Sequence, residues 1–288
     1  MVDSHGRFIW YELTTTDVDR AKAFYADVIG WGTQDVPVPG ARYTLFTADG
    51  TSVSGVMSLP ESASKIGFRP GWLGYVGVDD VDAAAARIKE LGGEVHVPPR
   101  DIPNVSRVSV AVDPQRVTFA LFKWLPDGGA SEPPPPPDLN AVGRVGWHEL
   151  IAADWEKAWP FYGALFGWQK ETTDSGDVGS YQVFSAGGQT IGGMFTKSPA
   201  VPVPFWLFYF NVADIDMALR RVKAGGGRVV DGPIEVPDSR WIAQCTDPQG
   251  AIFALVGKRS NNGIGYFERV TTDVASDPRN VIRKRYRL

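Results

Sequence analysis

The strongest constraint on the fold is an internal repeat. Residues 11–31 read YELTTTDVDRAKAFYADVIGW, and residues 148–168 read HELIAADWEKAWPFYGALFGW. Three further pairs of segments match in the same order: 42–56 with 180–194, 78–95 with 212–229, and 112–121 with 246–255. The offset drifts only between 133 and 138 residues, so short insertions or deletions separate the copies. A period of this length indicates a duplicated domain and not a solenoid of short repeats.

A proline-rich segment separates the two copies. It spans residues 126–140 and reads PDGGASEPPPPPDLN. Five consecutive prolines favour an extended polyproline helix, which acts as a stiff spacer. We therefore expect a first domain over residues 1–125, a linker over 126–140 and a second domain over 141–258. The remaining residues, 259–288, are basic; a solvated tail is expected there, with a binding arm as the alternative.

Both copies predict the same order of secondary structure. Residues 8–14 alternate and are rich in aromatic and β-branched types, which predicts a half-buried strand. Asp17 is the expected N-cap of an amphipathic helix over 17–29 that Gly30 ends. The rest of the first copy is predicted as strands at 43–48, 52–58 and 72–78, a helix at 80–91, and strands near 94–97, 107–112 and 117–123. The predicted fold class is α+β, with mixed sheets covered by helices on one face.

The composition excludes several classes of protein. A net charge of −4 and a pI of about 5.5 argue against a general nucleic-acid binder. No window approaches the ~20 apolar residues of a membrane span, and the start, MVDSHGRFIWYEL, lacks the pattern of a signal peptide. Cys245 is the only cysteine, so an internal disulfide is impossible. We therefore expect a cytoplasmic protein without membrane or nucleic-acid partners.

Two motifs resemble a known superfamily. AKAFYADVIGW and PFYGALFGW follow the first predicted strand of each copy, and a DPQ turn precedes the last strand. This order resembles the vicinal oxygen chelate superfamily, which includes glyoxalase I, extradiol dioxygenases and bleomycin-resistance proteins. The match covers about residues 7–124 and 144–257 and is similar to two-domain glyoxalase-like proteins of actinobacteria. The resemblance implies two tandem domains, each a pair of βαβββ modules whose mixed sheet forms a cup for the ligand.

The resemblance also assigns the positions of a divalent metal site. Enzymes of the superfamily typically hold the metal on inward-facing residues of the central strands. In this chain those positions are Trp10 and Trp147, Leu73 and Leu207, and Ala120 and Ala254. The strands SVSGVM and TIGGMF, which correspond to the remaining ligand, also lack a donor side chain. Divalent metals need imidazole, carboxylate or thiolate donors, so we expect neither a metal nor another cofactor.

Strand parity divides the neighbouring residues between two faces. Trp10 and Glu12 should face the cup, whereas Ile9, Tyr11 and Leu13 should cover the helix. His148 follows directly after an assigned metal position, so it should face the covering helix and serve packing.

Two glutamates stand beside the tryptophans of the predicted cups. Glu12 and Glu149 each lie two residues beyond a Trp and share its strand face. Because Glu is rarely buried unless paired, each is a candidate ligand anchor or general base with a raised pKa. The alternative is a structural ion pair, with Arg107 and Arg240 as possible partners. The sequence leaves both interpretations open.

The remaining cup residues are assigned from the strands beside the first one. The predicted ligand-binding set is Trp10, Glu12, Tyr43, Leu73, Tyr75, Trp147, Glu149, Tyr181, Met194, Leu207 and Tyr209. Val56 and Asn211 are expected on the same faces. Trp72 and Trp206 should point to the other face and pack in the core.

Two functions fit this composition of the cups. The first is a metal-free binding protein for a small, partly aromatic or cationic molecule. The second is a metal-independent isomerase, lyase or tailoring enzyme of secondary metabolism, in which Glu12 or Glu149 abstracts a proton. We expect the two domains to pack as an intramolecular pseudo-dimer, and a further homodimer stays open.

Overall fold

The computed structural model describes residues 4–38, 41–65, 67–125, 138–171 and 181–259. Most of the predicted linker, 126–137, and of the predicted tail, 260–288, lies outside the described residues. The first copy contains β1 Phe8–Thr15, α1 Val18–Ile29, β2 Gly32–Val38, β3 Ala41–Ala48, β4 Thr51–Ser58, α2 Glu61–Lys65, β5 Gly71–Gly77, α3 Val81–Glu90, β6 Glu94–Ile102, β7 Ser106–Val112 and β8 Thr118–Trp124. The second contains β9 Val145–Ala152, α4 Trp155–Phe166, β10 Gln169–Lys170, β11 Gln182–Ala186, β12 Gln189–Thr196, β13 Phe205–Asp214, α5 Ile215–Ala224, β14 Arg228–Val236, a 3₁₀ turn Pro237–Ser239, β15 Arg240–Thr246 and β16 Ile252–Lys258.

Each copy forms one eight-stranded mixed sheet from two βαβββ modules. The strand order in the first sheet is β2-β3-β4-β1-β5-β8-β7-β6, and the second sheet repeats it as β10-β11-β12-β9-β13-β16-β15-β14. Strand β1 is parallel to β4 and β5 is parallel to β8, because a helix crosses over within each module. The two modules join where β1 runs antiparallel to β5. The predicted fold class, α+β with two tandem domains, is confirmed.

An aspartate caps each of the four long helices, as predicted for Asp17. In α1, α3, α4 and α5 the carboxylate of the preceding Asp accepts a hydrogen bond from the backbone N–H three residues later. Such a cap stabilises a helix by about 1 kcal/mol relative to alanine. The apolar face of α1 is fully buried, as its helical spacing predicts. These local signals place each helix on one side of its sheet.

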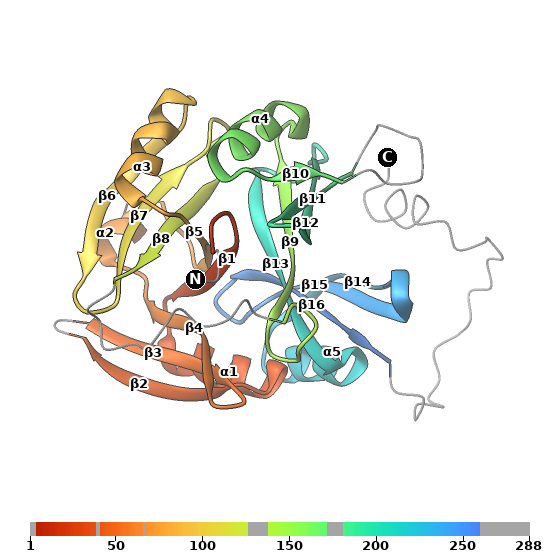
Figure 1. Ribbon diagram of the computed structural model, residues 1–288. Helices are drawn as coiled ribbons and strands as arrows, with labels where there is room; N and C mark the ends of the chain where they lie inside the picture. Colours follow the sequence, from red (N-terminus) through yellow and green to blue (C-terminus); the bar gives the residue numbers. More distant parts are fainter. Residues whose placement is uncertain (1–3, 39–40, 66, 126–137, 172–180, 260–288) are drawn as a thin grey trace.

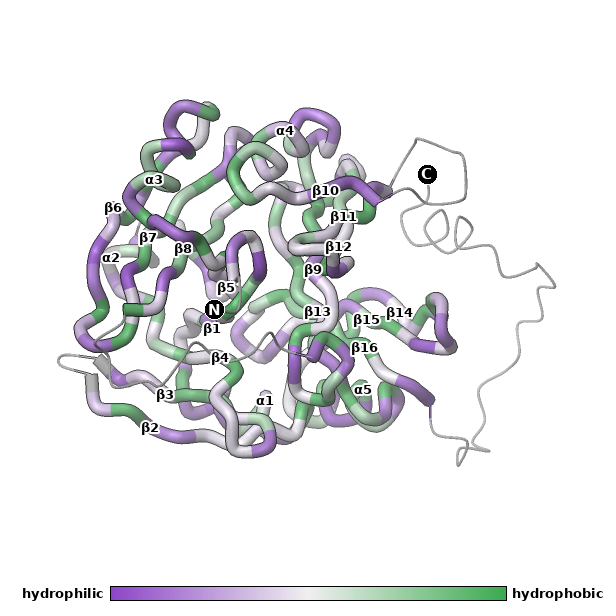
Figure 2. Tube along the Cα trace, in the orientation of Figure 1, coloured by the Kyte–Doolittle hydropathy of each residue, from purple (hydrophilic) through white to green (hydrophobic). Residues whose placement is uncertain are grey.

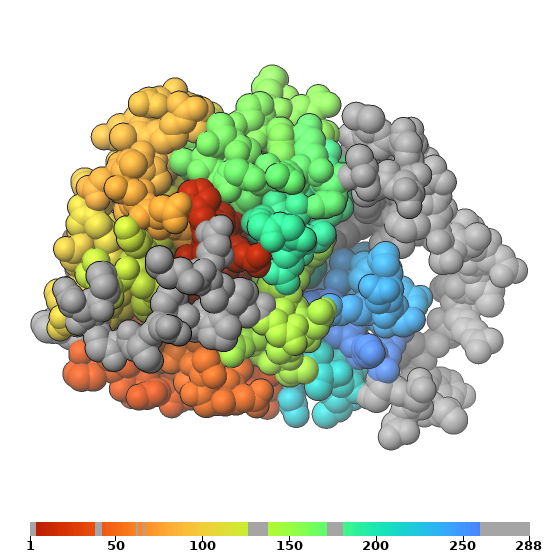
Figure 3. Space-filling model, viewed as in Figure 1, coloured from red at the N-terminus to blue at the C-terminus, as the bar shows by residue number. Residues whose placement is uncertain are grey.

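The helix-bearing sides of the two sheets pack against each other in a seam. One continuous core crosses from domain to domain, and Figure 2 shows hydrophobic residues along β9 and β13 in the middle of the molecule. Helix α1 lies beside α5, and α3 lies beside α4 (Figure 1). The described residues before β1 and the start of β1 lie between the two halves (Figure 3), where Phe8 stacks on His148 with ring centroids 4.3 Å apart. The concave sides of both sheets therefore face away from the seam.

Residues of the repeated FY and GW motifs make reciprocal hydrogen bonds across this seam. Tyr25 of α1 donates to Asp247 of the second domain at 3.2 Å, and Tyr162 of α4 donates to Asp113 of the first at 2.9 Å. The tryptophans that end the motifs behave in the same way. Trp31 Nε1 donates to the carbonyl of Gly143 at 2.8 Å, and Trp168 Nε1 to that of Gly6 at 2.6 Å. The motifs are repeated because each domain binds the other through the same contacts.

Trp72 and Trp206 lie in the seam, as predicted from their strand faces. Trp72 Nε1 donates to Tyr25 Oη at 3.0 Å, and Trp206 Nε1 donates to Tyr162 Oη at 3.3 Å. Ile9 differs from its prediction. A β-bulge between Phe8 and Trp10 breaks the alternation, so Ile9 packs on the cup side beside Trp10 and not under the helix.

Candidate ligand-binding cups

The first cup holds a chain of hydrogen bonds that ends on Glu12. Trp10 Nε1 donates to Tyr43 Oη at 3.3 Å, and Tyr43 Oη donates to Glu12 Oε2 at 3.1 Å. From the other side, Tyr75 Oη donates to Glu12 Oε1 at 3.2 Å. Strands β1, β3 and β5 therefore bring four predicted residues together around one carboxylate.

The second cup repeats this arrangement with its own residues. Trp147 Nε1 donates to Tyr181 Oη at 2.8 Å, and Tyr181 Oη donates to Glu149 Oε1 at 3.1 Å. Tyr209 Oη donates to Glu149 Oε2 at 2.7 Å. The same four residues, one Trp, two Tyr and one Glu, at equivalent positions of both domains produce the same network, so the network is a property of the repeat.

A glycine in each domain makes room for the tyrosine that crosses the sheet. Gly55 of β4 lies opposite Glu12, and a Cβ there would stand 2.0 Å from Tyr43 Oη. Gly193 of β12 lies opposite Glu149, and a Cβ there would stand 2.3 Å from the ring of Tyr181. Real Cβ atoms do not approach so closely, so only glycine lets the ring lie across the strand and reach the carboxylate. These glycines were missed, although they match in the aligned repeat.

Apolar side chains from the central strands form the wall of each cup. In the first cup they are Tyr75, Val108, Ala120 and Phe122, with Ile9, Trp10, Leu73, Val110 and Trp124 partly buried beside them. In the second they are Ile151, Phe195, Leu207, Tyr209, Ile242, Ala254 and Val256, with Trp147, Tyr181, Val201, Phe205, Ile234 and Val236 partly buried. Leu73 and Leu207 thus line the cups beside Glu12 and Glu149, their partners in the sheet register.

The positions assigned to the superfamily's metal lie on these walls and do not fit a metal. Tyr75 pairs with Ala120 and Tyr209 pairs with Ala254, so each alanine stands next to the carboxylate network. Neither Ala, Leu nor the indole of Trp supplies a donor that a divalent cation prefers. Among the described residues, no three His, Cys, Asp or Glu side chains gather as a metal site. The carboxylate in each cup is instead occupied by tyrosine hydroxyls.

Enclosure in the cup shifts the proton equilibria of the first network. It raises the pKa of Glu12, and the hydrogen bonds from Tyr43 and Tyr75 and the charge of Arg100 oppose this rise. Burial, together with the nearby Glu12 charge, raises the pKa of Tyr43 and Tyr75 above the ordinary value of tyrosine. The two phenols therefore stay protonated and act as donors.

Met194 was predicted to line the second cup, and this was wrong. It pairs with Leu150 and is fully buried in the core of the seam, on the opposite face. Val56 lies on the corresponding face of the first domain and is equally buried. The cup-facing positions of β12 are Gly193 and Phe195, because Gly193 is the partner of Glu149 in the register.

The predicted arginine partners of the glutamates were also wrong. Arg107 pairs with Asp82 and Asp101, whereas Arg240 donates to Asn211. The two arginines do not occupy equivalent positions in the repeat. Arg107 pairs with Lys123 in the sheet register, whereas Arg240 lies at the position that corresponds to Ser106 of the first domain. Asn211 itself donates to the carbonyls of 139 and 141 and anchors the entry to β9.

His148 lies on the face away from the cup, as strand alternation predicts. Its ring is fully buried in the seam, where Nδ1 lies 2.6 Å from the carbonyl of Ile191 and Nε2 lies 2.5 Å from Tyr11 Oη. Burial lowers the pKa of His148 to about 4. The ring is neutral at physiological pH and belongs to the packing of the two domains.

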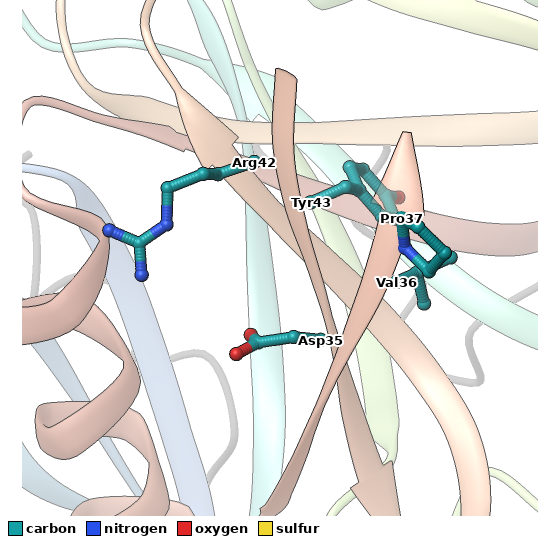
Figure 4. Close-up of a pocket in the computed structure, with 5 residues that line it drawn as sticks. All are labelled: Asp35, Val36, Pro37, Arg42 and Tyr43. Carbon is teal, nitrogen blue, oxygen red and sulfur yellow. The ribbon is translucent and has the colours of Figure 1, made fainter. Parts of the chain in front are cut away.

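A hollow of about 320 Å³ flanks the first cup at the edge of its sheet. Asp35, Val36 and Pro37 of β2 line it together with Arg42 and Tyr43 of β3 (Figure 4). The Asp35 and Arg42 side chains extend to one side of the strands, where they form ion pairs with Lys22 and Asp19. Tyr43 is the residue that this hollow shares with the Glu12 network.

No helix among the described residues is both long and apolar enough to cross a membrane.

Comparisons with known proteins agree with the fold and the repeat. The family model described as "Glyoxalase/Bleomycin resistance protein/Dioxygenase superfamily" matches residues 7–121 and 144–255. The chain is 34% identical over 250 residues to "Putative glyoxylase CFP32" of Mycobacterium tuberculosis, which covers 86% of this chain and 93% of that protein. It is 31% identical over 262 residues to "Anthracycline biosynthesis protein DnrV" of Streptomyces peucetius, which covers 87% of this chain and 92% of that protein.

Solved structures show the same fold at lower identity. The Mn(II)-bound glyoxalase of Novosphingobium aromaticivorans has a TM-score of 0.59 at 17% identity, over 89% of this chain and 83% of that one. The 2,3-dioxygenase LapB of Pseudomonas sp. KL28 has a TM-score of 0.60 at 13% identity, over 93% and 97%. These likenesses carry the fold alone. Because the family model spans both copies and the relatives exceed 30% identity over most of their length, the chain belongs to the glyoxalase/bleomycin resistance protein/dioxygenase superfamily.

Proposed function

We propose that the protein binds a small, planar, partly aromatic molecule that presents a hydrogen-bond donor or a cation to a cup glutamate. The observation that carries this proposal is the network in each cup, in which two tyrosines and a tryptophan orient one carboxylate. A carboxylate oxygen has two lone pairs. In the first cup each oxygen of Glu12 accepts one tyrosine hydrogen, which leaves acceptor capacity toward the ligand.

The walls suit an aromatic ligand. Hydrogen bonds link Trp10, Tyr43 and Tyr75 to the Glu12 network, and Phe122 and Trp124 belong to the same apolar wall as Tyr75. Aromatic rings stack on such surfaces, and a cation over a ring face gains further attraction. The donor set of the cups does not fit a divalent metal, so the proposed binding is independent of metal.

Relatives support the same class of ligand. DnrV is named for anthracycline biosynthesis, and anthracyclines are planar polycyclic aromatic molecules. CFP32 carries the word glyoxylase in its name, but the positions that the superfamily uses for metal hold Trp, Leu and Ala in this chain. The name of DnrV agrees with a planar aromatic ligand, and the residues at the metal positions argue against a metal-dependent reaction on a small aldehyde adduct.

A second candidate function rests on the raised pKa of Glu12. A carboxylate whose pKa lies closer to neutrality is a better general base, and the protonated Tyr43 and Tyr75 can stabilise developing negative charge on a carbonyl oxygen. The protein would then be a metal-independent isomerase, lyase or tailoring enzyme. Glu12→Gln separates the two functions, because a base variant retains binding and loses turnover.

Native mass spectrometry of protein purified from its host tests the proposed binding. The expected result is a retained organic molecule that disappears in the Glu12→Gln, Glu149→Gln double variant. Methyl 6-amino-2-naphthoate, followed by its fluorescence, provides a defined probe, with methyl 2-naphthoate as the control that lacks the donor. The amine should bind at least tenfold more tightly. Absence of any retained molecule together with equal affinity for both esters would refute the proposal.

A further inference from the structure

The two cups have the same network but unequal access. Glu12 and Leu73 are partly exposed in the first cup. In the second cup Glu149 is 2% exposed and Leu207 1% exposed, so the equivalent surface is closed. The difference lies in the residues around the networks.

Larger apolar residues fill the second cup at equivalent positions. Thr14 and Met57 pair across β1 and β4, and their counterparts across β9 and β12 are Ile151 and Phe195, both 2% exposed. Phe195 also stacks on Tyr181, with ring centroids 6.0 Å apart. The side chains of the second domain therefore occupy the space that a ligand would need.

A charged residue replaces an apolar one at the mouth of the first cup. Arg100 of β6 is the partner of Val108, and Val108 belongs to the wall of the first cup. The equivalent pair in the second domain is Ile234 and Ile242, and both belong to its apolar wall. Antiparallel partners share a face, so Arg100 lies on the cup side of its sheet.

Arg100 is close enough to interact electrostatically with Glu12 and Tyr75. It is exposed, and among the described residues no ion pair joins it to a carboxylate, whereas Arg107 of β7 and Arg116 of the β7–β8 turn are both paired. A guanidinium in this position can donate two parallel hydrogen bonds to an acid group. The first cup thus presents an acceptor at its base and a planar cation at its mouth.

We propose that the first cup is the working site and that Arg100 selects planar ligands that carry an acid group at one end and a hydrogen-bond donor at the other. The donor would meet Glu12, the ring would lie between the aromatic walls, and the acid group would meet Arg100. The second cup is then a filled copy that stabilises the fold. This inference rests on the proposed function and adds to it the cup and the class of ligand.

A matched pair of fluorescent probes tests the proposal on the full chain. The probes are 6-amino-2-naphthoic acid and its methyl ester, which differ in charge but hardly in size. The wild-type protein should bind one equivalent of the acid about tenfold more tightly than the ester, as expected for a charge-assisted hydrogen bond at a partly exposed site. Arg100→Gln should abolish this preference and leave the affinity for the ester unchanged. Arg116→Gln, which removes the same charge from the β7–β8 turn of the same domain, should keep the preference.

Variants of the two glutamates show which of the two cups binds the probes. Glu12→Gln should weaken both probes, and Glu149→Gln should weaken neither. Retained preference in Arg100→Gln, or a loss of binding in Glu149→Gln with none in Glu12→Gln, would overturn the inference while leaving the proposed function standing. Failure of both probes to bind the wild-type protein would overturn both.

Discussion

Tyr11 donates its hydroxyl hydrogen to Nε2 of His148 across the domain seam, over 2.5 Å. The direction follows from the other ring nitrogen. Nδ1 lies 2.6 Å from the carbonyl of Ile191, which can only accept, so Nδ1 carries the proton and Nε2 is the acceptor. Tyr11 and His148 occupy the same place in the two copies. A duplicated chain can place two different residue types, here Tyr and His, at equivalent positions, whereas identical subunits always carry the same residue there.

The buried His148 should make the protein sensitive to mild acid. Its pKa is about 4 in the folded state and about 6.5 in an unfolded chain. The unfolded state therefore binds the proton first, and the free energy of unfolding should fall by about 3 kcal/mol as pH drops from 6.5 to 4. Urea unfolding at several pH values measures this loss. His148→Gln should be less stable at pH 7 but should lose about 3 kcal/mol less between pH 6.5 and 4; parallel pH profiles would contradict the assignment.

The reciprocal tyrosine bonds should stabilise the seam between the two domains. Tyr162→Phe leaves the buried Asp113 carboxylate without its side-chain donor, which should cost about 1–3 kcal/mol. Tyr25→Phe removes the equivalent donor from Asp247 and should cost a similar amount. Both variants should still unfold in one calorimetric transition at a lower temperature. Changes below about 0.5 kcal/mol in both would show that these bonds do not stabilise the seam.

Sequence patterns predicted most of the fold because the local signals agree with the packing. The Asp caps and the apolar spacing define α1 and α3 within one residue of the predicted bounds. Strand β2 was not predicted. Its sequence, GTQDVPV, lacks alternation and contains Pro37, which is tolerated because β2 lies at the edge of the sheet and needs hydrogen bonds on one side only.

The candidate site was predicted in part. Residues two apart on a strand share a face, so the sequence predicts that Trp10 and Glu12 face the same side, and that Leu73 and Tyr75 do so on β5. The hydrogen bond from Tyr43 to Glu12 could not be predicted in the same way, because Tyr43 reaches the carboxylate only across Gly55 on a third strand. Arg100 was missed for a related reason. Pro98 and Pro99 precede it at a bulge in β6, and a bulge changes which residues face the cup.

Substitution of Gly55, which the Tyr43 ring crosses, tests the hydrogen-bond network around Glu12. Gly55→Ala should push the Tyr43 hydroxyl away from Glu12, because the far end of a side chain moves more easily than a strand. The carboxyl of Glu12 then loses a donor and its pKa should rise further, which carbon-detected NMR titration of the carboxyl measures. Gly71→Ala is the matched control, since its Cβ would meet only the Arg69 carbonyl at 3.9 Å. An unchanged Glu12 titration in Gly55→Ala would mean that Tyr43 does not control the carboxylate.

Glu12 should affect stability and binding with opposite dependence on pH. Enclosure raises its folded-state pKa above that of an unfolded chain, so the folded state binds the proton more tightly. The stabilisation is complete below the unfolded pKa of about 4.3 and is lost as pH rises through the folded pKa. Glu12→Gln should therefore gain stability relative to wild type as pH rises toward 7.

The affinity for a ligand that donates a hydrogen bond should show the opposite dependence on pH, because the ionised carboxylate of Glu12 is a stronger hydrogen-bond acceptor than the protonated one. The affinity of the wild-type protein for methyl 6-amino-2-naphthoate should be highest at neutral pH and fall as pH drops through the Glu12 pKa. Glu12→Gln should bind this probe more weakly and with little dependence on pH over the same range. Fluorescence titrations and urea unfolding in the same buffers compare the two trends directly. If stability and affinity change together with pH, Glu12 is a structural residue and the ligand is recognised elsewhere.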